Sequence, residues 1–139
     1  MPTPVEEAVI LLVEDNADNL FIVSDILKED VKAKYVNARA SGRQLFKLLE
    51  SKRDLKPDLI LLDLQIPYED GYVVLRQLRA HPTLGETTVV AITANVLPQD
   101  VERTRRAGFD GFIGKPIDLD RFPQQVRRIL NGEAVWEPR

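Results

Sequence analysis

Four short apolar runs in the chain are each followed directly by side chains that could do chemistry. A run such as Ile60–Leu62, bounded by charge and proline, is typical of a strand buried on both faces of a parallel sheet. An unpaired charge is costly to bury, so we expect a carboxylate after such a run at the mouth of the strand rather than in the core. The residues concerned are Glu14 and Asp15 after 9–13, Asp63 after 60–62, Thr93 after 88–92 and Lys115 after 111–114.

These side chains together predict a phosphoryl-transfer site. In open α/β sheets, ligands bind at the carboxyl ends of the strands, where these residues would meet. Three carboxylates close together repel one another and favour a cation, and oxygen ligands without cysteine point to Mg²⁺, with Mn²⁺ as the alternative. The cation and Lys115 would neutralise phosphoryl oxygens, the Thr93 hydroxyl would donate to one of them, and Asp63 would be the nucleophile.

Each of these residues also has an ordinary explanation when it is taken alone. Glu14 and Asp15 could stabilise the start of the following helix. Thr93 could be present for its strand propensity, and Lys115 could be a solvated loop residue. Their joint occurrence after four different strands favours a shared site.

The segments between the strands predict helices, because apolar residues recur there at helical spacing. With a more polar strand at 32–38, the chain alternates strand and helix five times. This alternation predicts an α/β fold with five helices on the two faces of a five-stranded parallel sheet, in the doubly wound, flavodoxin-like order 2-1-3-4-5. The expected helices span 17–28, 42–52, 71–80, 98–106 and a last segment to 130, whose late start is favoured by Pro123.

The overall composition limits the class of protein. A length of 139 residues with 44% apolar content suits one domain, expected at 8–130 between a loose leader at 1–7 and a tail at 131–139. The net charge of −3 disfavours nucleic-acid binding, and the absence of cysteine excludes thiolate metal sites. His81 is the only histidine, which excludes a catalytic triad and histidine metal clusters. The apolar run at 8–13 is too short to span a membrane and follows no basic segment, so we expect a cytoplasmic protein without membrane contact.

Four segments, with their order and spacing, resemble the receiver domain of two-component response regulators over roughly residues 8–130. They are Leu12–Asn16, Asp63–Gly71, Ile92–Ala94 and Lys115–Pro116. The resemblance implies a single-domain response regulator and a phosphoprotein, in which Asp63 accepts a phosphoryl group from a phosphohistidine in a Mg²⁺-dependent step. It also implies that the chain is not an enzyme with a separate substrate, since it would catalyse only its own phosphorylation and dephosphorylation.

The resemblance also implies roles for the other residues of the site. Lys115 would pair with the phosphate through a cis Lys115–Pro116 bond. The metal ligands would be Asp15, Asp63 and the backbone carbonyl of Gln65, with Glu14 acting through water. Gln65 and Asn95 would lie where side chains reach the water that hydrolyses the acyl phosphate. Because both are amides rather than ionisable bases, moderate rather than very fast self-dephosphorylation is expected.

Thr93 and Phe112 would form the switch of such a receiver. On phosphorylation the Thr93 hydroxyl would move to the phosphate and the Phe112 ring would turn inward, changing the face made by 98–106, 111–114 and the last helix. On sequence alone, Phe112 is explained as well by core packing. The implied partners are a sensor histidine kinase or histidine phosphotransfer protein and a downstream protein effector. Whether the chain also forms a homodimer through the same face is left open by the sequence.

Three alternatives remain at this stage. A phosphatase like those of the haloacid dehalogenase family also forms an aspartyl phosphate, but it needs a second acid where this chain has Gln65. A flavodoxin-type carrier of flavin mononucleotide would have a hydroxyl- and glycine-rich first loop, whereas Glu14 and Asp15 would repel an anion. A receiver that forms part of a longer hybrid kinase is the nearest alternative. Trp136 in the tail either packs on the domain or contacts a partner.

Overall fold

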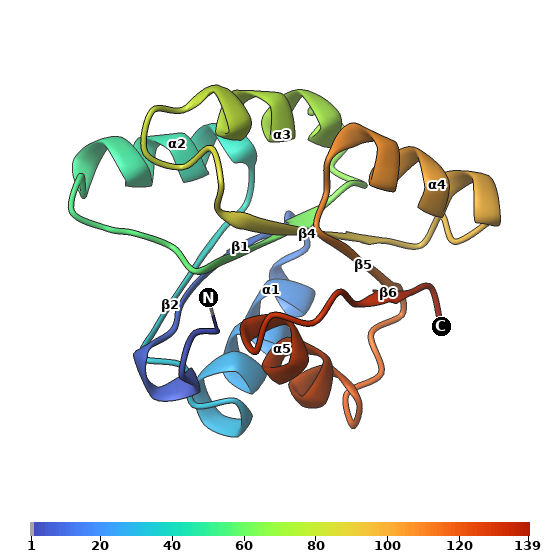
Figure 1. Ribbon diagram of the computed structural model, residues 1–139, viewed down its shortest axis with the longest axis horizontal. Coiled ribbons are helices and arrows are strands. Elements are labelled where there is room, and N and C mark those ends of the chain that lie inside the picture. The colour runs from blue at the N-terminus through green and yellow to red at the C-terminus, as the bar shows by residue number, and fades with distance from the viewer. Residues whose placement is uncertain (1) are drawn as a thin grey trace.

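The computed structural model describes residues 2–139, and its strands form one sheet in the order β2-β1-β3-β4-β5-β6 (Figure 1). All neighbouring strands pair in parallel. The first five strands therefore have the predicted doubly wound order, and β6 is an addition that the sequence pattern did not predict. The strands are β1 (Val9–Val13), β2 (Tyr35–Arg39), β3 (Leu59–Asp63), β4 (Thr88–Thr93), β5 (Gly111–Gly114) and β6 (Trp136–Glu137).

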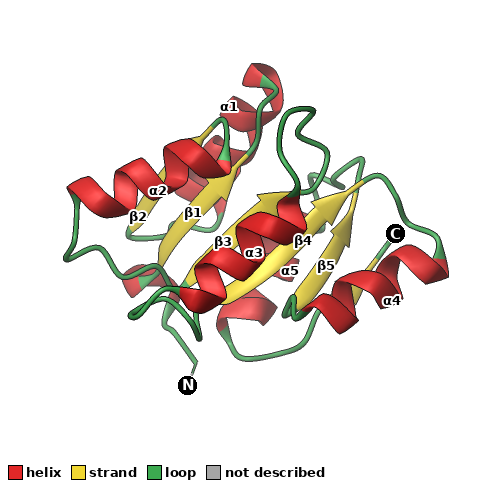
Figure 2. Cartoon of the chain, turned by 90° about the horizontal axis from the view of Figure 1, so that it is seen from above, coloured by secondary structure: helices red, strands yellow, loops and turns green. Residues whose placement is uncertain are grey.

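The described residues contain the five predicted α-helices, which cover both faces of the sheet. Figure 1 shows α2, α3 and α4 on one face and α1 and α5 on the other, and Figure 2 shows the sheet between them from above. Their bounds are α1 (Ala17–Asp25), α2 (Gly42–Ser51), α3 (Gly71–Ala80), α4 (Pro98–Ala107) and α5 (Phe122–Leu130). None of the helices in residues 2–139 is long and apolar enough to cross a membrane.

Alternate residues of the central strands enter two separate cores. Leu12 and Leu61 belong to the core shared with α1 and α5, whereas Leu11 and Ile60 belong to the core shared with α2 and α3. Each of these side chains is at most 2% exposed. Full burial of such a side chain contributes about 1.5–3 kcal/mol. The burial of both faces of the central strands therefore stabilises the sheet and determines which residues lie at its carboxyl edge.

Several helix ends follow the local signals of the sequence. The Ser41 hydroxyl accepts a hydrogen bond from the Gln44 amide (3.1 Å) and caps α2. Gly108 ends α4 with φ of 103°, a left-handed conformation that suits glycine. The predicted late start of α5 is confirmed, because Pro123 lies in its first turn, where a missing amide costs little.

Three details differ from the prediction. The helix predicted at 17–28 ends at Asp25 and widens into a π-helical turn (Ile26–Asp30), which keeps both Ile26 and Leu27 buried. The second strand begins only at Tyr35. The leader is not loose where it is described, because a single 3₁₀ turn forms at Val5–Glu7 and the Thr3 amide donates to the Leu130 carbonyl (2.8 Å). Met1 lies outside the described residues.

Candidate functional site

The carboxyl ends of four parallel strands meet at one edge of the sheet. The pairing register sets Asp63 of β3 level with Ile92 of β4, and Thr93 of β4 level with Gly114 of β5. The residues that end these strands, or follow them directly, therefore converge at this edge. They include Glu14 and Asp15 after β1, Asp63 at the end of β3, Thr93 at the end of β4 and Lys115 after β5.

Lys115 bridges two of the carboxylates. Its Nζ lies 2.7 Å from Asp63 Oδ2 and 3.2 Å from Glu14 Oε1. The side chains of Asp63 and Glu14 are 2% and 4% exposed, so these acids are buried rather than placed at an open strand mouth as expected. The lysine explains the difference, because a paired charge can be buried where an unpaired one cannot. The Lys115–Pro116 peptide bond is cis.

The surroundings shift the pKa of both Glu14 and Lys115. Burial raises the pKa of Glu14, and the hydrogen bond with Asp63 and the charge of Asp63 raise it further. The Asn16 amide and Lys115 lower this pKa, but their effect is the smaller one. Burial alone would lower the pKa of Lys115, but its hydrogen bond and charge interaction with Asp63, together with Glu14, outweigh burial and raise the pKa. The lysine is therefore held in its charged form beside the acids.

Backbone amides orient the same carboxylates. The Gln65 amide donates to Asp63 Oδ1 (2.8 Å), so one Asp63 oxygen contacts an amide and the other contacts Lys115. The Asn16 amide donates to Glu14 Oε2 (3.2 Å). Hydrogen bonds to both oxygens fix the direction in which the Asp63 carboxylate points, as a reacting or metal-binding group requires.

A divalent cation fits the acid cluster. Glu14, Asp15 and Asp63 each offer a carboxylate oxygen, and these oxygens lie within 4.8 Å of one another. Asp15 is exposed while the other two are buried, so the cluster is open to solvent on the side of Asp15. Several carboxylates with an open side suit Mg²⁺ or Mn²⁺, which bind oxygen and commonly retain waters.

Thr93 and the two amide residues lie beside this cluster. The buried Thr93 hydroxyl accepts a hydrogen bond from the Asn95 amide (3.1 Å), and Asn95 itself is exposed. The Gln65 side chain accepts from the Ala94 amide (2.7 Å) and so joins the loop after β3 to the loop after β4. Thr93 and Asn95 also line a cavity of ≈ 280 Å³ between α3 and α4.

Phe112 belongs to the hydrophobic core and not to the acid cluster. Its ring is fully buried on the face of the sheet that carries α2 and α3, and its amide donates to the Val135 carbonyl (2.8 Å). The ring is therefore already turned inward, while its backbone is held by the C-terminal segment. No pattern in the sequence indicated this second contact.

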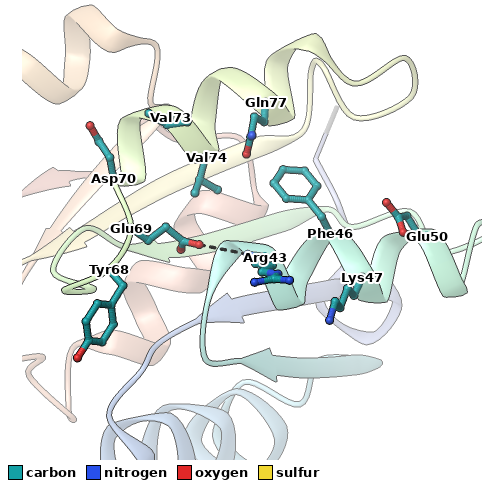
Figure 3. Close-up of a pocket in the computed structure, with 10 residues that line it drawn as sticks. All are labelled: Arg43, Phe46, Lys47, Glu50, Tyr68, Glu69, Asp70, Val73, Val74 and Gln77. Atoms are coloured by element: carbon teal, nitrogen blue, oxygen red, sulfur yellow. Dashed lines mark hydrogen bonds between the residues drawn. The ribbon is translucent and has the colours of Figure 1, made fainter.

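Glu69 lies in the loop after β3 and makes a contact that no pattern in the sequence indicated. Its carboxylate accepts hydrogen bonds from the Gly42 amide (2.6 Å) and the Arg43 amide (3.2 Å) at the start of α2. Figure 3 marks the bond to Arg43. It therefore ties the loop that follows Asp63 to a neighbouring helix, and it favourably places a negative charge at the helix N-terminus. The cavity of ≈ 750 Å³ beside Glu69 is lined by residues of α2 and α3 and by the loop before α3, not by the acid cluster (Figure 3).

A doubly wound sheet with paired acids and a lysine at its carboxyl edge has the parts of a phosphoryl-transfer site. The family described as the response regulator receiver domain matches residues 10–127, and the chain belongs to this family. The family and the fold class predicted from the sequence are thus confirmed, and the chain is a receiver domain of two-component signalling with an acidic pocket.

Similar proteins agree with this placement. The polar-differentiation response regulator DivK of Brucella anthropi is 33% identical over 125 residues, which cover 90% of this chain and 97% of DivK. A receiver domain of a signal transduction histidine kinase from Syntrophus aciditrophicus is 32% identical, with a TM-score of 0.74 and coverage of 90% and 91%. The receiver domain of a sensor histidine kinase from Pseudomonas aeruginosa is 30% identical, with a TM-score of 0.72 and coverage of 91% and 99%. That structure has a magnesium ion coordinated in its active-site cleft.

Proposed function

We propose that this receiver is the phosphoacceptor of a phosphorelay, and that Asp63 takes the phosphoryl group from a phosphohistidine of a sensor histidine kinase or histidine phosphotransfer protein. The observation that carries the proposal is the position of the Asp63 carboxylate, 2.7 Å from the Lys115 ammonium and within the acid cluster of Glu14 and Asp15. A nucleophile that lies beside a fixed cation and is oriented by the Gln65 amide suits acyl-phosphate formation.

The transfer exchanges one bond to phosphorus for another. One Asp63 oxygen forms the new O–P bond while the N–P bond of the phosphohistidine breaks, and the imidazole leaves neutral because its other ring nitrogen already carries a proton. Lys115 then pairs with an oxygen of the bound phosphoryl group, and its raised pKa keeps it charged for this role. The chain acts on itself in this scheme and turns over no separate substrate.

The acid cluster supports Mg²⁺ as the cofactor, with Mn²⁺ as the alternative. Asp15, Asp63 and the Gln65 carbonyl would hold the ion directly, and Glu14 would act through water. When bound, the ion supplies positive charge that offsets the negative charge of the phosphoryl oxygens. The magnesium-bound kinase receiver from Pseudomonas aeruginosa, 30% identical to this chain, supports this choice.

The output of this receiver would start at Thr93. Its hydroxyl would turn from the Asn95 amide to donate to the phosphoryl group, which changes the packing beside the cavity at α4. Since Phe112 is already buried, its part in the switch is to stay inward rather than to move in. The surface formed by α4, β5 and α5 would then contact a downstream effector or a second copy.

Three further expectations belong to this proposal. The receiver unit is residues 8–130, with 131–139 as a tail, and it acts in the cytoplasm. Gln65 and Asn95 tune the lifetime of the acyl phosphate, which is moderate because neither is an ionisable base.

A receiver within a longer hybrid kinase is the second candidate, favoured by the likeness to two kinase receivers at 32% and 30% identity.

Intact mass spectrometry after treatment with a small-molecule phosphodonor and Mg²⁺ tests the proposal. We expect one added phosphoryl group on the wild type and none on Asp63→Asn or in the presence of a chelator. Asp54→Asn, at an exposed loop position, is the matched control and should be labelled like the wild type. Labelling of Asp63→Asn to the wild-type extent would refute the assignment.

A further inference from the structure

The C-terminal segment Val135–Pro138 lies along the edge of β5 that faces away from β4 (Figure 1). Its strand β6 pairs in parallel with β5, which sets Trp136 level with Phe112 and Glu137 level with Ile113. Without this segment, β5 would be the outer strand of the sheet, with unpaired backbone groups that another strand could bind. The chain therefore binds a strand of its own on this edge.

Glu137 is held by three side chains around α5. Its carboxylate accepts hydrogen bonds from Arg128 (2.7 Å), Arg121 (2.8 Å) and Gln125 (3.0 Å). Two guanidinium groups thus converge on one acid, and together with the amide they define a receptor for a carboxylate at this strand position. A lysine at the same position of a bound strand would meet like charges.

Trp136 is held from the side of α4. The Arg105 guanidinium carbon lies 4.3 Å from the centroid of the Trp136 ring, and the ring packs against the core that contains Phe112. A cation over an aromatic face is attractive, so this position selects an aromatic side chain. The sequence left open whether Trp136 packs on the domain or contacts a partner, and in the structure it packs on the domain.

The glycines of β5 allow the strand to approach closely. A Cβ at Gly111 would come 2.7 Å from the Val135 carbonyl oxygen, and one at Gly114 would collide with the Pro138 carbonyl. Any side chain at either position would push the bound strand away. The β5 edge is therefore shaped for an extended backbone along its whole length.

We propose that the β5 edge, with Arg105 on one side and Arg121 and Arg128 on the other, is a peptide-docking site whose partner is an extended segment carrying an aromatic residue followed by an acid. The chain's own segment Val135–Pro138 occupies this site, and a partner engages it by replacing that segment as the outer strand. Main-chain pairing gives affinity in this mode and alternate side chains give specificity. The tethered segment competes at about millimolar effective concentration, so only a well-matched partner displaces it.

This inference rests on the proposed function in one respect, because it names the kind of partner for the surface proposed above as the output face. It adds that part of this surface is covered by the tail, and that the covering residues describe the ligand. The acid cluster takes no part in the docking contacts.

The test uses the full chain with its own segment weakened by Trp136→Ala and Glu137→Lys. Neither residue belongs to the acid cluster, and the substituted chain contains no tryptophan because Trp136 is the only one. A synthetic peptide of residues 133–139 then carries the only fluorescent indole. We expect saturable binding, at least ten-fold tighter to the weakened chain than to the wild type, with amide shifts confined to β5 and the facing sides of α4 and α5.

A charge reversal provides the matched control. The same peptide with Glu137→Lys should not bind the weakened chain, but it should bind a chain that carries Trp136→Ala, Arg121→Glu and Arg128→Glu and keeps Glu137, because its own Glu137 then meets two acids. Equal binding of both peptides, no binding by a folded weakened chain, or pairing of weakened chains into dimers would overturn the proposal.

Phosphoryl labelling of Asp63 in the same samples separates the two proposals. Peptide binding that persists in Asp63→Asn, with labelling lost, would uphold docking on its own. Normal labelling without peptide binding would refute docking and leave Asp63 as the acceptor.

Discussion

Replacement of Lys115 by methionine tests whether this lysine is the counter-charge of the buried acids. At an effective dielectric constant of about 20, its contacts of 2.7 Å to Asp63 and 3.2 Å to Glu14 correspond to about 6 and about 5 kcal/mol before desolvation. Desolvation of the lysine offsets much of this attraction. Removing one partner of a buried ion pair typically costs about 3–5 kcal/mol, because the remaining charge is left uncompensated.

We therefore expect Lys115→Met to lower the free energy of unfolding by about 3 kcal/mol at neutral pH in chelator. Millimolar Mg²⁺ should restore part of this loss, because a cation among Glu14, Asp15 and Asp63 replaces the missing positive charge. Urea unfolding of both proteins, with and without Mg²⁺, gives the four free energies. Lys56→Met, at an exposed loop position, is the control and should change little.

A loss below about 1 kcal/mol in chelator would refute the assignment of Lys115 as the counter-charge, since that is the range of an exposed ion pair. A loss that is the same with and without Mg²⁺ would refute the shared position of the lysine and the cation.

Three other predictions concern the metal, the tail and a helix end. Mg²⁺ should raise the melting temperature of the wild type and raise that of Asp15→Asn by less, because one carboxylate of the cluster is lost; equal shifts in a thermal scan would contradict the site. Hydrogen bonds from Gln125 and Arg128 lower the pKa of Glu137 from its ordinary 4.5. As the pH falls, Glu137 therefore takes up its proton in the unfolded chain before it does so in the folded chain. Its contribution to stability is thus present above about pH 5 and lost as the pH falls through the folded-state pKa, and urea titrations should show a shallower acid loss for Glu137→Gln than for the wild type. Gly108→Ala should cost about 1 kcal/mol in urea unfolding, since φ is 103° there and no neighbouring atom obstructs the methyl group; an unchanged midpoint would rule out backbone strain.

The sheet and the site edge could be predicted from the sequence because their signals are local. Five strand patterns alternate with segments in which apolar residues recur at helical spacing. Right-handed crossovers leave few arrangements of strands for such a chain. The parallel register then brings residues that directly follow the strands, such as Asp15 and Lys115, to one edge. That edge is where the structure has them.

Three features could not be predicted, for different physical reasons. The burial of Glu14 and Asp63 depends on a lysine far along the chain, and no local pattern encodes that pairing. The contact from Glu69 to the start of α2 likewise joins distant segments. The strand β6 has only two residues, Trp136 and Glu137, too few for any period-two pattern, and its position follows from side chains on α4 and α5.

Locating the phosphoryl group on the chain is the most direct test of Asp63 as the phosphoacceptor. After reaction with a phosphodonor and Mg²⁺, borohydride reduces an aspartyl phosphate to homoserine, which marks the residue for tandem mass spectrometry. We expect homoserine at position 63 and nowhere else, with none formed in chelator. Homoserine at another acid, or a stable phosphoryl group on His81, would contradict it.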